Sequence, residues 1–294
     1  MNELSRRYGI PLTVLFIVLT AFWLLALVIL PYLYLFENSF RPYLPVAEMG
    51  GPKDIYSFDN YLVFFQSPIH IQVFIWTILY SSIVTVLCFA IAYPLAYYLA
   101  KIASNSIVPT LFLLLLIPLW VSEILRSFAW FIILALKGPL NIILAGMGII
   151  DQPIRWMSGF RSIIIGLVYT YVLFMLFPLY NAVSSLDTNQ IEAAEDLGSP
   201  WWRTHWRVIL PHAKPGIASG AVMVFMLSAG SILVPTLLAS TTSRWFTEII
   251  QQWMFESQDW NTGSAYAFLL LALCTVFVSV VMRAFRVSLS DIAR

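Results

Sequence analysis

Apolar residues run through this chain in long, nearly uninterrupted stretches. The hydrocarbon core of a bilayer is about 30 Å thick, so a helix needs roughly 20 mainly apolar residues to cross it. Six stretches meet that length, and each predicts a membrane-spanning helix. They cover residues 11–36, 72–100, 107–136, 160–186, 217–239 and 262–285. We therefore expect an all-α integral membrane protein with six transmembrane helices.

The third stretch is the least regular of these. Glu123 and Arg126 interrupt it, and Lys137-Gly138-Pro139 ends it. The apolar run that follows, residues 140–150, is too short to cross a bilayer and is expected to be interfacial or re-entrant. An alternative joins residues 127–136 to this run as one span, which gives seven crossings and puts the two termini on opposite sides.

Composition agrees with a membrane protein. Hydrophobic residues make up 60% of the chain and charged residues 11%, whereas soluble domains carry roughly 25% charged residues. The formal charge of +1 gives no reason to expect nucleic-acid binding. Cys88 and Cys274 lie inside apolar runs and are expected to be small buried hydrophobes. His70, His205 and His212 have no cysteine or carboxylate at ligand spacing, so we expect no metal site.

Basic residues in the loops predict the orientation. With six spans, one side carries nine of them: Arg6, Arg7, Lys101, Arg203, Arg207, Lys214, Arg283, Arg286 and Arg294. The other side carries six: Arg41, Lys53, Lys137, Arg155, Arg161 and Arg244. By the positive-inside rule, both termini and the loop at 187–216 are expected to be cytoplasmic. Residues 287–294 are then a cytoplasmic tail, and residues 1–71 form a first span with an outer loop.

The loop at 187–216 begins with a predicted short helix. Asn189, with Glu192 three residues later, is expected to cap its N-terminus. Glu192, Glu195 and Asp196 are expected to favour the positive N-terminal half of the helix through its dipole. Gly198 is expected to end it, because glycine tolerates the left-handed conformation of the residue that follows a helix.

A second short helix is predicted between two prolines. Pro200 suits its first position and Pro211 is expected to close it, with Trp202, Trp206 and Ile209 on one face. Two interpretations of the tryptophans are open on the residues alone. They can anchor a cytoplasmic partner, because aromatic side chains supply much of the binding energy at such surfaces. They can also belong to the aromatic belt at the membrane interface.

The loop resembles a known motif. Glu192-Ala193-Ala194, Gly198 four residues after Ala194, and Leu210-Pro211 match the EAA loop of binding-protein-dependent ABC importer permeases, with Val208 where that family usually has isoleucine. The resemblance covers residues 72–286, the permease domain. It implies the type I permease fold and favours docking, because in that family this loop is the coupling helix that binds the ATPase subunit.

A second stretch resembles one branch of this family. Residues 118–130, the segment Lys137-Gly-Pro-Leu-Asn141 and Ile150-Asp151 are similar to spermidine/putrescine permeases of the PotB type. The resemblance implies a polyamine as the transported solute. Permeases for ferric iron, thiamine, an opine or another small solute work by the same kind of machine and stay open as alternatives.

The resemblance implies an energy source outside the chain. No G-x-x-x-x-G-K-[ST] motif occurs in the sequence, so it predicts no ATPase site, no enzyme activity and no bound cofactor. The resemblance implies an ATPase dimer that uses ATP and Mg²⁺, a second homologous permease and a substrate-binding protein, in a bacterial inner membrane. The alternative of a different class is an ion-coupled secondary carrier that works alone, although no paired broken helices are evident.

Two charges interrupt the third predicted span about halfway along. Glu123 and Arg126 are three residues apart and so share one helix face. Charge inside a membrane costs a few kcal/mol per group, which makes a functional role the first hypothesis. Glu123, with Trp120 and Trp130, then lines the path of a cationic substrate, and Asp151 is a further candidate at the outer mouth. The alternatives are a mutual ion pair, or an Arg126 that orders the interface with a partner permease.

Overall fold

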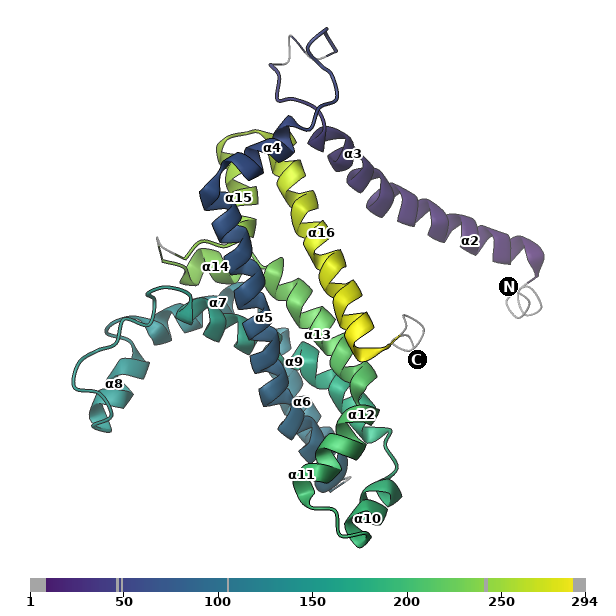
Figure 1. The fold of residues 1–294 in the computed structure, drawn as a ribbon, viewed down its shortest axis with the longest axis vertical. Helices are drawn as coiled ribbons and strands as arrows, with labels where there is room; N and C mark the ends of the chain where they lie inside the picture. The colour runs from purple at the N-terminus through teal and green to yellow at the C-terminus, as the bar shows by residue number, and fades with distance from the viewer. Residues whose placement is uncertain (1–8, 46–47, 49, 105, 241–242, 288–294) are drawn as a thin grey trace. The chain divides into compact units, whose positions relative to one another are not determined.

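The computed structural model describes residues 9–45, 48, 50–104, 106–240 and 243–287 (Figure 1). All regular structure within these ranges is helical, with α marking α-helices and η marking π-turns. The first elements are α2 (Ile10–Leu24), η1 (Leu25–Ile29), α3 (Leu30–Ser39), α4 (Asp59–Gln66), α5 (Pro68–Tyr97), η3 (Tyr98–Ile102), α6 (Val108–Trp120), α7 (Glu123–Leu134) and α8 (Pro139–Gly146). They are followed by α9 (Arg161–Ser184), α10 (Thr188–Asp196), α11 (Trp201–Thr204), η4 (His205–Ile209), α12 (Leu210–His212), α13 (Lys214–Ala229), α14 (Leu233–Leu238), α15 (Phe246–Gln251), η5 (Gln252–Glu256) and α16 (Trp260–Phe285).

Candidate membrane spans number five or six in the described residues, against six predicted from the sequence. Within the described ranges, five helical stretches are long and apolar enough to cross a bilayer: Ile10–Ser39, Pro68–Ile102, Glu123–Gly146, Arg161–Ser184 and Trp260–Phe285. A sixth forms when the pair Trp201–His212 and Lys214–Ala229, bent by 72°, counts as one. The chain also divides by packing into two compact units, residues 1–68 with 250–269 and residues 69–249 with 270–294.

The third predicted span is wrong as a single helix. α6 ends at Trp120, and the extended residues Val121 and Ser122 separate it from α7. With 13 residues, α6 is about 20 Å long, too short to cross a bilayer. α7 and α8 instead make up an apolar stretch of 24 residues, so the alternative that joined 127–136 to 140–150 describes this segment better. Ser122 is the N-cap residue of α7 without a side-chain capping bond, and Glu123 lies in the first turn, where the helix dipole favours a carboxylate.

The fifth predicted span, 217–239, is also interrupted. α13 ends at Ala229 and α14 begins at Leu233. Side chains in and just before α15 replace the missing helical hydrogen bonds. Trp245 Nε1 donates to Ser228 O at 3.1 Å, and Thr247 Oγ1 donates to Ser231 O at 2.6 Å. Non-helical backbone at membrane depth is tolerated where protein satisfies it in this way.

In the first unit, the stretch from α2 to α3 has almost no protein neighbours, since 6% of its most apolar window is buried. Its apolar side chains therefore need lipid or a partner. After α3, Arg41 holds the following loop: it donates to Glu37 at 2.6 Å, to Asp54 at 2.9 Å and to Tyr56 at 3.1 Å. The hydrogen bonds with Tyr56 and Glu37 raise the pKa of the Arg41 guanidinium above its ordinary value.

In the second unit, α9 and α13 pack at close range. Gly216 and Gly220 lie on one face of α13, and an added Cβ at Gly216 would be 2.5 Å from the Ala182 Cβ. At Gly220 an added Cβ would be 2.6 Å from the Met175 sulfur. This is the G-x-x-x-G pattern that lets membrane helices approach closely, and it is readable in the sequence although hydropathy does not reveal it.

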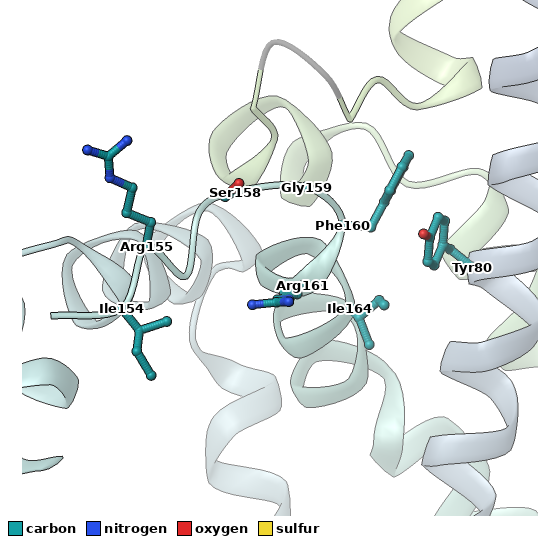
Figure 2. Close-up of a pocket in the computed structure, with 8 residues that line it drawn as sticks. All are labelled: Tyr80, Ile154, Arg155, Ser158, Gly159, Phe160, Arg161 and Ile164. Atoms are coloured by element: carbon teal, nitrogen blue, oxygen red, sulfur yellow. The ribbon is translucent and has the colours of Figure 1, made fainter. Parts of the chain in front are cut away.

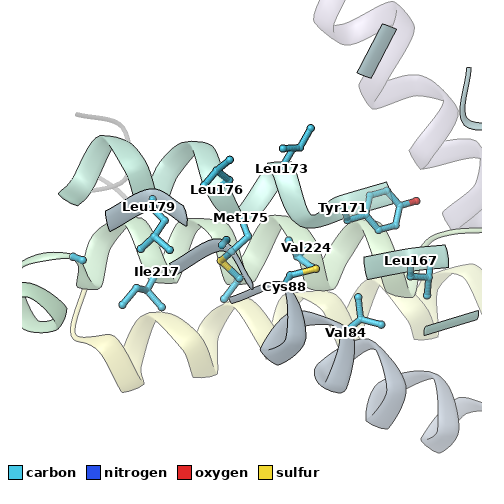
Figure 3. Close-up of a cluster of buried hydrophobic side chains, with 14 of the residues drawn as sticks. Val84, Cys88, Leu167, Tyr171, Leu173, Met175, Leu176, Leu179, Ile217 and Val224 are labelled. Carbon is cyan, nitrogen blue, oxygen red and sulfur yellow. The ribbon is translucent and has the colours of Figure 1, made fainter. Parts of the chain in front are cut away.

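The core of the second unit forms around this helix pair (Figure 3). Val84 and Cys88 of α5 meet Leu167 and Met175 of α9 and Val224 of α13, all buried. Both cysteines are free and buried, as their apolar surroundings predicted. The α9–α13 pair therefore forms a rigid support, and the 187–216 loop connects the C-terminal end of α9 to the start of α13.

Candidate functional sites

The first helix of the 187–216 loop, α10, begins two residues earlier than the sequence suggested. Asp187, and not Asn189, is its N-cap, and its carboxylate accepts from Asn189 N at 3.0 Å. Because α10 ends at Asp196, Glu195 and Asp196 lie in its last turn, where the helix dipole is negative and carboxylates are unfavourable. The expected dipole stabilisation by these two residues is thus wrong, and their charges face solvent instead.

The end of α10 is as predicted. Gly198 has a φ of 74°, in the left-handed region that glycine adopts at little cost. Gly198 N donates to Glu195 O at 2.8 Å, and Ser199 N donates to Ala194 O at 3.0 Å. These two bonds define a Schellman motif. Glu192 and Ala193 are exposed and Ala194 is half-buried, so the EAA residues present a solvent-facing surface.

The second helix of the loop runs from Trp201 to His212, across α11, η4 and α12. Pro200 is its N-cap and not its first residue, and Pro211 lies inside it and does not close it. The π-turn η4 ends two residues before Pro211. Because proline lacks an N–H and its ring crowds the carbonyl four residues earlier, a widened turn accommodates it.

This π-turn also separates the residues that were expected on one face. Trp202 and Trp206 are exposed by 56% and 69%, whereas Ile209 is 1% exposed and packs in the core. The single apolar face predicted for these three residues is therefore wrong. Leu210 is half-buried and Pro211 is exposed, so the outward surface of the loop carries the two tryptophans, the EAA residues and Pro211.

Two connections tie the loop to the C-terminal half of α5. The Lys101 ammonium donates to the carbonyl oxygens of Ser184 and Leu186, where α9 ends. On the second helix of the loop, a 2.6 Å hydrogen bond joins His205 Nδ1 to the Tyr93 hydroxyl. These contacts hold the end of α9 and the second helix of the loop to the same transmembrane helix, Pro68–Ile102.

The intramembrane carboxylate lies at a helix start and not halfway along a span. Glu123 is in the first turn of α7, and the Tyr171 hydroxyl on α9 donates to its Oε1 at 3.1 Å. Among the described residues, the ion pairs are those of Arg41 and Lys53, so Glu123 and Arg126 do not neutralise each other. Arg126 Nε is buried and has no hydrogen-bond partner in the part of the chain that the structure describes.

The aromatic candidates divide in two. Trp130 forms an edge-to-face pair with Tyr169, with ring centroids 5.4 Å apart, and Tyr169 lies two residues before Tyr171 on α9. Trp120 is 88% exposed and Asp151 is exposed, and no contact in the described part of the chain links either one to Glu123. The structure therefore shows two separate pairs between α7 and α9, Glu123 with Tyr171 and Trp130 with Tyr169, and it leaves Trp120 and Asp151 apart from both.

Sequence reasoning gave Tyr171 no role, because a tyrosine in an apolar run carries no signal of its own. It also gave none to Asn141, which is 3% exposed. The Asn141 amide donates to Leu136 O at 3.0 Å and to Ile154 O at 2.9 Å, and its Oδ1 accepts from Trp156 Nε1 at 3.0 Å. A lone asparagine in an apolar run was the available signal, since such a side chain needs partners.

A pocket of about 510 Å³ opens at the N-terminal end of α9, the end opposite to the 187–216 loop (Figure 2). Tyr80 and Phe160 stack face to face at one side, with ring centroids 4.0 Å apart. Arg155 and Arg161 supply its positive charge, and both are exposed. In Figure 2, Arg155 points away from the aromatic pair, whereas Arg161 lies over the first turn of α9.

Comparison with known proteins decides the family. Residues 89–290 match the family model described as "Binding-protein-dependent transport system inner membrane component". The chain belongs to this family. The match includes the whole 187–216 loop, and the description agrees with an inner-membrane, multi-pass protein.

Relatives of this permease cover nearly its full length. It is 32% identical over 274 residues to the spermidine/putrescine transport system permease protein PotB of Salmonella typhimurium (strain SL1344), which covers 92% of this chain and 94% of the relative. It is 33% identical over 264 residues to PotB of Escherichia coli (strain K12), covering 90% and 94%.

Solved structures support the fold. A bacterial ABC transporter involved in the import of the acidic polysaccharide alginate matches with a TM-score of 0.73 at 18% identity, over 97% of each chain. A bacterial alginate ABC transporter in complex with alginate pentasaccharide-bound periplasmic protein matches with a TM-score of 0.76 at 18% identity, over 98% of this chain and 99% of that one. These likenesses confirm the all-α type I permease fold.

Proposed function

We propose that this permease is the transmembrane subunit of an ATP-driven importer for spermidine or putrescine. The observation that carries the proposal is its similarity to PotB proteins of several bacteria, at 32% to 34% identity over about nine-tenths of both chains. That similarity favours a polyamine over ferric iron, thiamine or an opine. Membership of a binding-protein-dependent family favours an importer with partners over a carrier that works alone.

The 187–216 loop is the surface on which we place the ATPase. Its exposed tryptophans and carboxylates do not stabilise the loop itself: Trp202 and Trp206 face outward, and Glu195 and Asp196 oppose the dipole of α10. Groups that oppose local stability are expected where a partner uses them. ATP and Mg²⁺ are bound by the ATPase pair, and its closure moves the loop and tips the spans between inward-open and outward-open states.

Glu123 is the group that we assign to the cationic substrate. Tyr171 occupies one carboxylate oxygen, Oε1, and Glu123 is only half-buried. A protonated amine can therefore approach the carboxylate, and the Trp130–Tyr169 pair, which also joins α7 to α9, offers aromatic rings for cation–π contact. At the N-terminal end of α9, Arg155 and Arg161 form a positive rim around the pocket, and we assign this rim to acidic side chains of the loaded binding protein.

The direct test is uptake in bacteria that lack their own spermidine and putrescine importers. The chain is expressed with its cognate ATPase, second permease and binding protein, and uptake of radiolabelled putrescine and spermidine is measured. We expect uptake only when all partners are present, with no loss on adding a protonophore while cellular ATP stays high. No uptake of either polyamine by the complete set would refute the cargo. Transport by this chain alone, stopped by the protonophore, would refute the importer.

A further inference from the structure

His205 differs from its neighbours on the second helix of the 187–216 loop. Trp202 and Trp206 are exposed, whereas His205 is 5% exposed. Its ring lies between aromatic side chains, with centroids 4.5 Å from Tyr97 and 4.3 Å from Trp201. The 2.6 Å hydrogen bond between its Nδ1 and the Tyr93 hydroxyl completes the enclosure. One loop side chain is thus inserted into the surface of a transmembrane helix.

The residues that receive the loop form a stripe. Tyr93, Tyr97 and Lys101 follow one another at intervals of four, which places them on one face of α5 and η3. Tyr93 and Tyr97 contact His205, and Lys101 binds the carbonyl oxygens of Ser184 and Leu186 at the end of α9, just before the loop. Three successive turns of one helix therefore contact the chain just before the loop and the second helix within it.

Stability alone does not explain the histidine. Its second nitrogen, Nε2, is buried without a hydrogen-bond partner among the described residues, and an unsatisfied buried polar atom is unfavourable. A phenylalanine would fill the same aromatic enclosure without that penalty. Histidine instead forms a directional hydrogen bond to Tyr93 of α5. Tyr93 is next to Pro94, which lacks an N–H and so weakens the helical hydrogen bonding at a point where α5 can bend.

We propose that Tyr93 and His205 form a latch that transmits the displacement of the 187–216 loop to α5. His205 is then a positioning residue: it touches neither substrate nor nucleotide, and it makes α5 move with the docked ATPase. The inference rests on the proposed function, because it takes the loop as the element that the ATPase moves. It adds which transmembrane helix receives the motion and through which two side chains.

The experiment compares transport with hydrolysis in proteoliposomes that contain the complete importer. Tyr93→Phe removes the hydroxyl alone, and His205→Phe removes the bond and keeps an aromatic ring. Tyr97→Phe is the matched control, since Tyr97 contacts His205 through its ring. His212→Ala is the second control, because this exposed histidine bonds Ser185 at 3.0 Å and not α5.

We expect the ratio of polyamine moved to ATP hydrolysed to fall at least fivefold in Tyr93→Phe and in His205→Phe, with stimulated hydrolysis within twofold of the wild type. The double variant should be no worse than either single one, because both remove the same bond. The two controls should keep the wild-type ratio. Unchanged ratios in both latch variants would overturn the proposal, as would equal losses in the controls or a loss of ATPase co-purification, which indicates a purely structural role.

A second readout needs no cargo and so separates this proposal from the choice of substrate. Spin labels are placed on cysteines introduced at Ser104, after η3, and at Ser158, near the start of α9; both native cysteines are buried. Trapping the ATPase with ATP and vanadate should change the distance between the labels in the wild type, and the latch variants should abolish the change. A wild type without any change, or variants that keep it, would refute the latch even if the importer carries another solute.

Discussion

Gly198 offers the sharpest perturbation of the docking loop. Its φ of 74° lies in the left-handed region, and an added Cβ would meet nothing within 4 Å. The cost of Gly198→Ala is therefore conformational and not steric, about 1–2 kcal/mol for an L-residue in this region. Since about 1.4 kcal/mol corresponds to a tenfold change in an equilibrium constant, the equilibrium constant that favours the docking-competent end of α10 over other conformations should fall roughly 5- to 30-fold.

The assay is the affinity of the purified ATPase for the detergent-solubilised permease complex, followed by polyamine uptake. Gly198→Ala should weaken binding by that factor, and Gly198→Asn should weaken it less, because asparagine tolerates the left-handed conformation. Gly148 provides a matched control: its φ is 69°, an added Cβ would meet nothing within 4 Å, and it lies outside the loop. If Gly198→Ala left affinity and uptake unchanged, or if Gly148→Ala reduced ATPase binding equally, the reasoning would fail.

Three further changes test other parts of the account. Glu123→Gln should lower polyamine uptake about tenfold or more, because a hydrogen bond to a charged group contributes about 1.5–3 kcal/mol. Complex assembly and basal ATP hydrolysis should stay intact, and normal uptake by this variant would exclude the pathway role. Gly220→Leu should overpack the α9–α13 contact, lower the free energy of unfolding by about 1–3 kcal/mol and lower the thermal midpoint of the solubilised permease by roughly 2–4 °C per kcal/mol. Gly146→Leu should leave the midpoint unchanged, because an added Cβ at Gly146 meets nothing within 4 Å. Equal midpoints for the two variants would contradict this packing. Trp202→Ala and Trp206→Ala should each weaken ATPase binding about tenfold. Unchanged binding would favour the other interpretation, in which these tryptophans belong to the aromatic belt at the membrane interface.

Hydropathy predicted most of the fold because crossing a bilayer requires long apolar helices. It could not locate the breaks within them. Ser122 and the segment from Gly230 to Ile232 interrupt helices that remain apolar on both sides, so a window average passes over them. The second break depends on tertiary partners, because Trp245 and Thr247 bind the carbonyl oxygens of Ser228 and Ser231.

Local turn chemistry was predictable to a different extent in each part of the loop. Gly198 was identified correctly because a left-handed residue after a helix has few substitutes for glycine. The N-cap was misplaced by two residues because Asp187 and Asn189 are both good caps. The faces of Trp202 and Ile209 were misjudged because a π-turn ahead of Pro211 changes the helical repeat, which a regular periodicity cannot anticipate.

Single candidate site residues could be identified from the sequence, but their distant partners could not. Glu123 was visible from the sequence as a charge within an apolar run, whereas its partner Tyr171 is 48 residues away. His205 was set aside as a metal ligand because no ligand lay at the right spacing. Its partner Tyr93 is 112 residues away, and only the packing of the loop against α5 brings the two together.

Cross-linking tests most directly whether the ATPase docks on the 187–216 loop. Ala193→Cys introduces an exposed thiol on α10 and Ser158→Cys one beyond the opposite end of α9, in a chain whose two own cysteines are buried. A short bifunctional reagent applied to the assembled importer should join Cys-substituted position 193 to the ATPase and leave position 158 unlinked to it. A product from position 158, with none from position 193, would contradict the account.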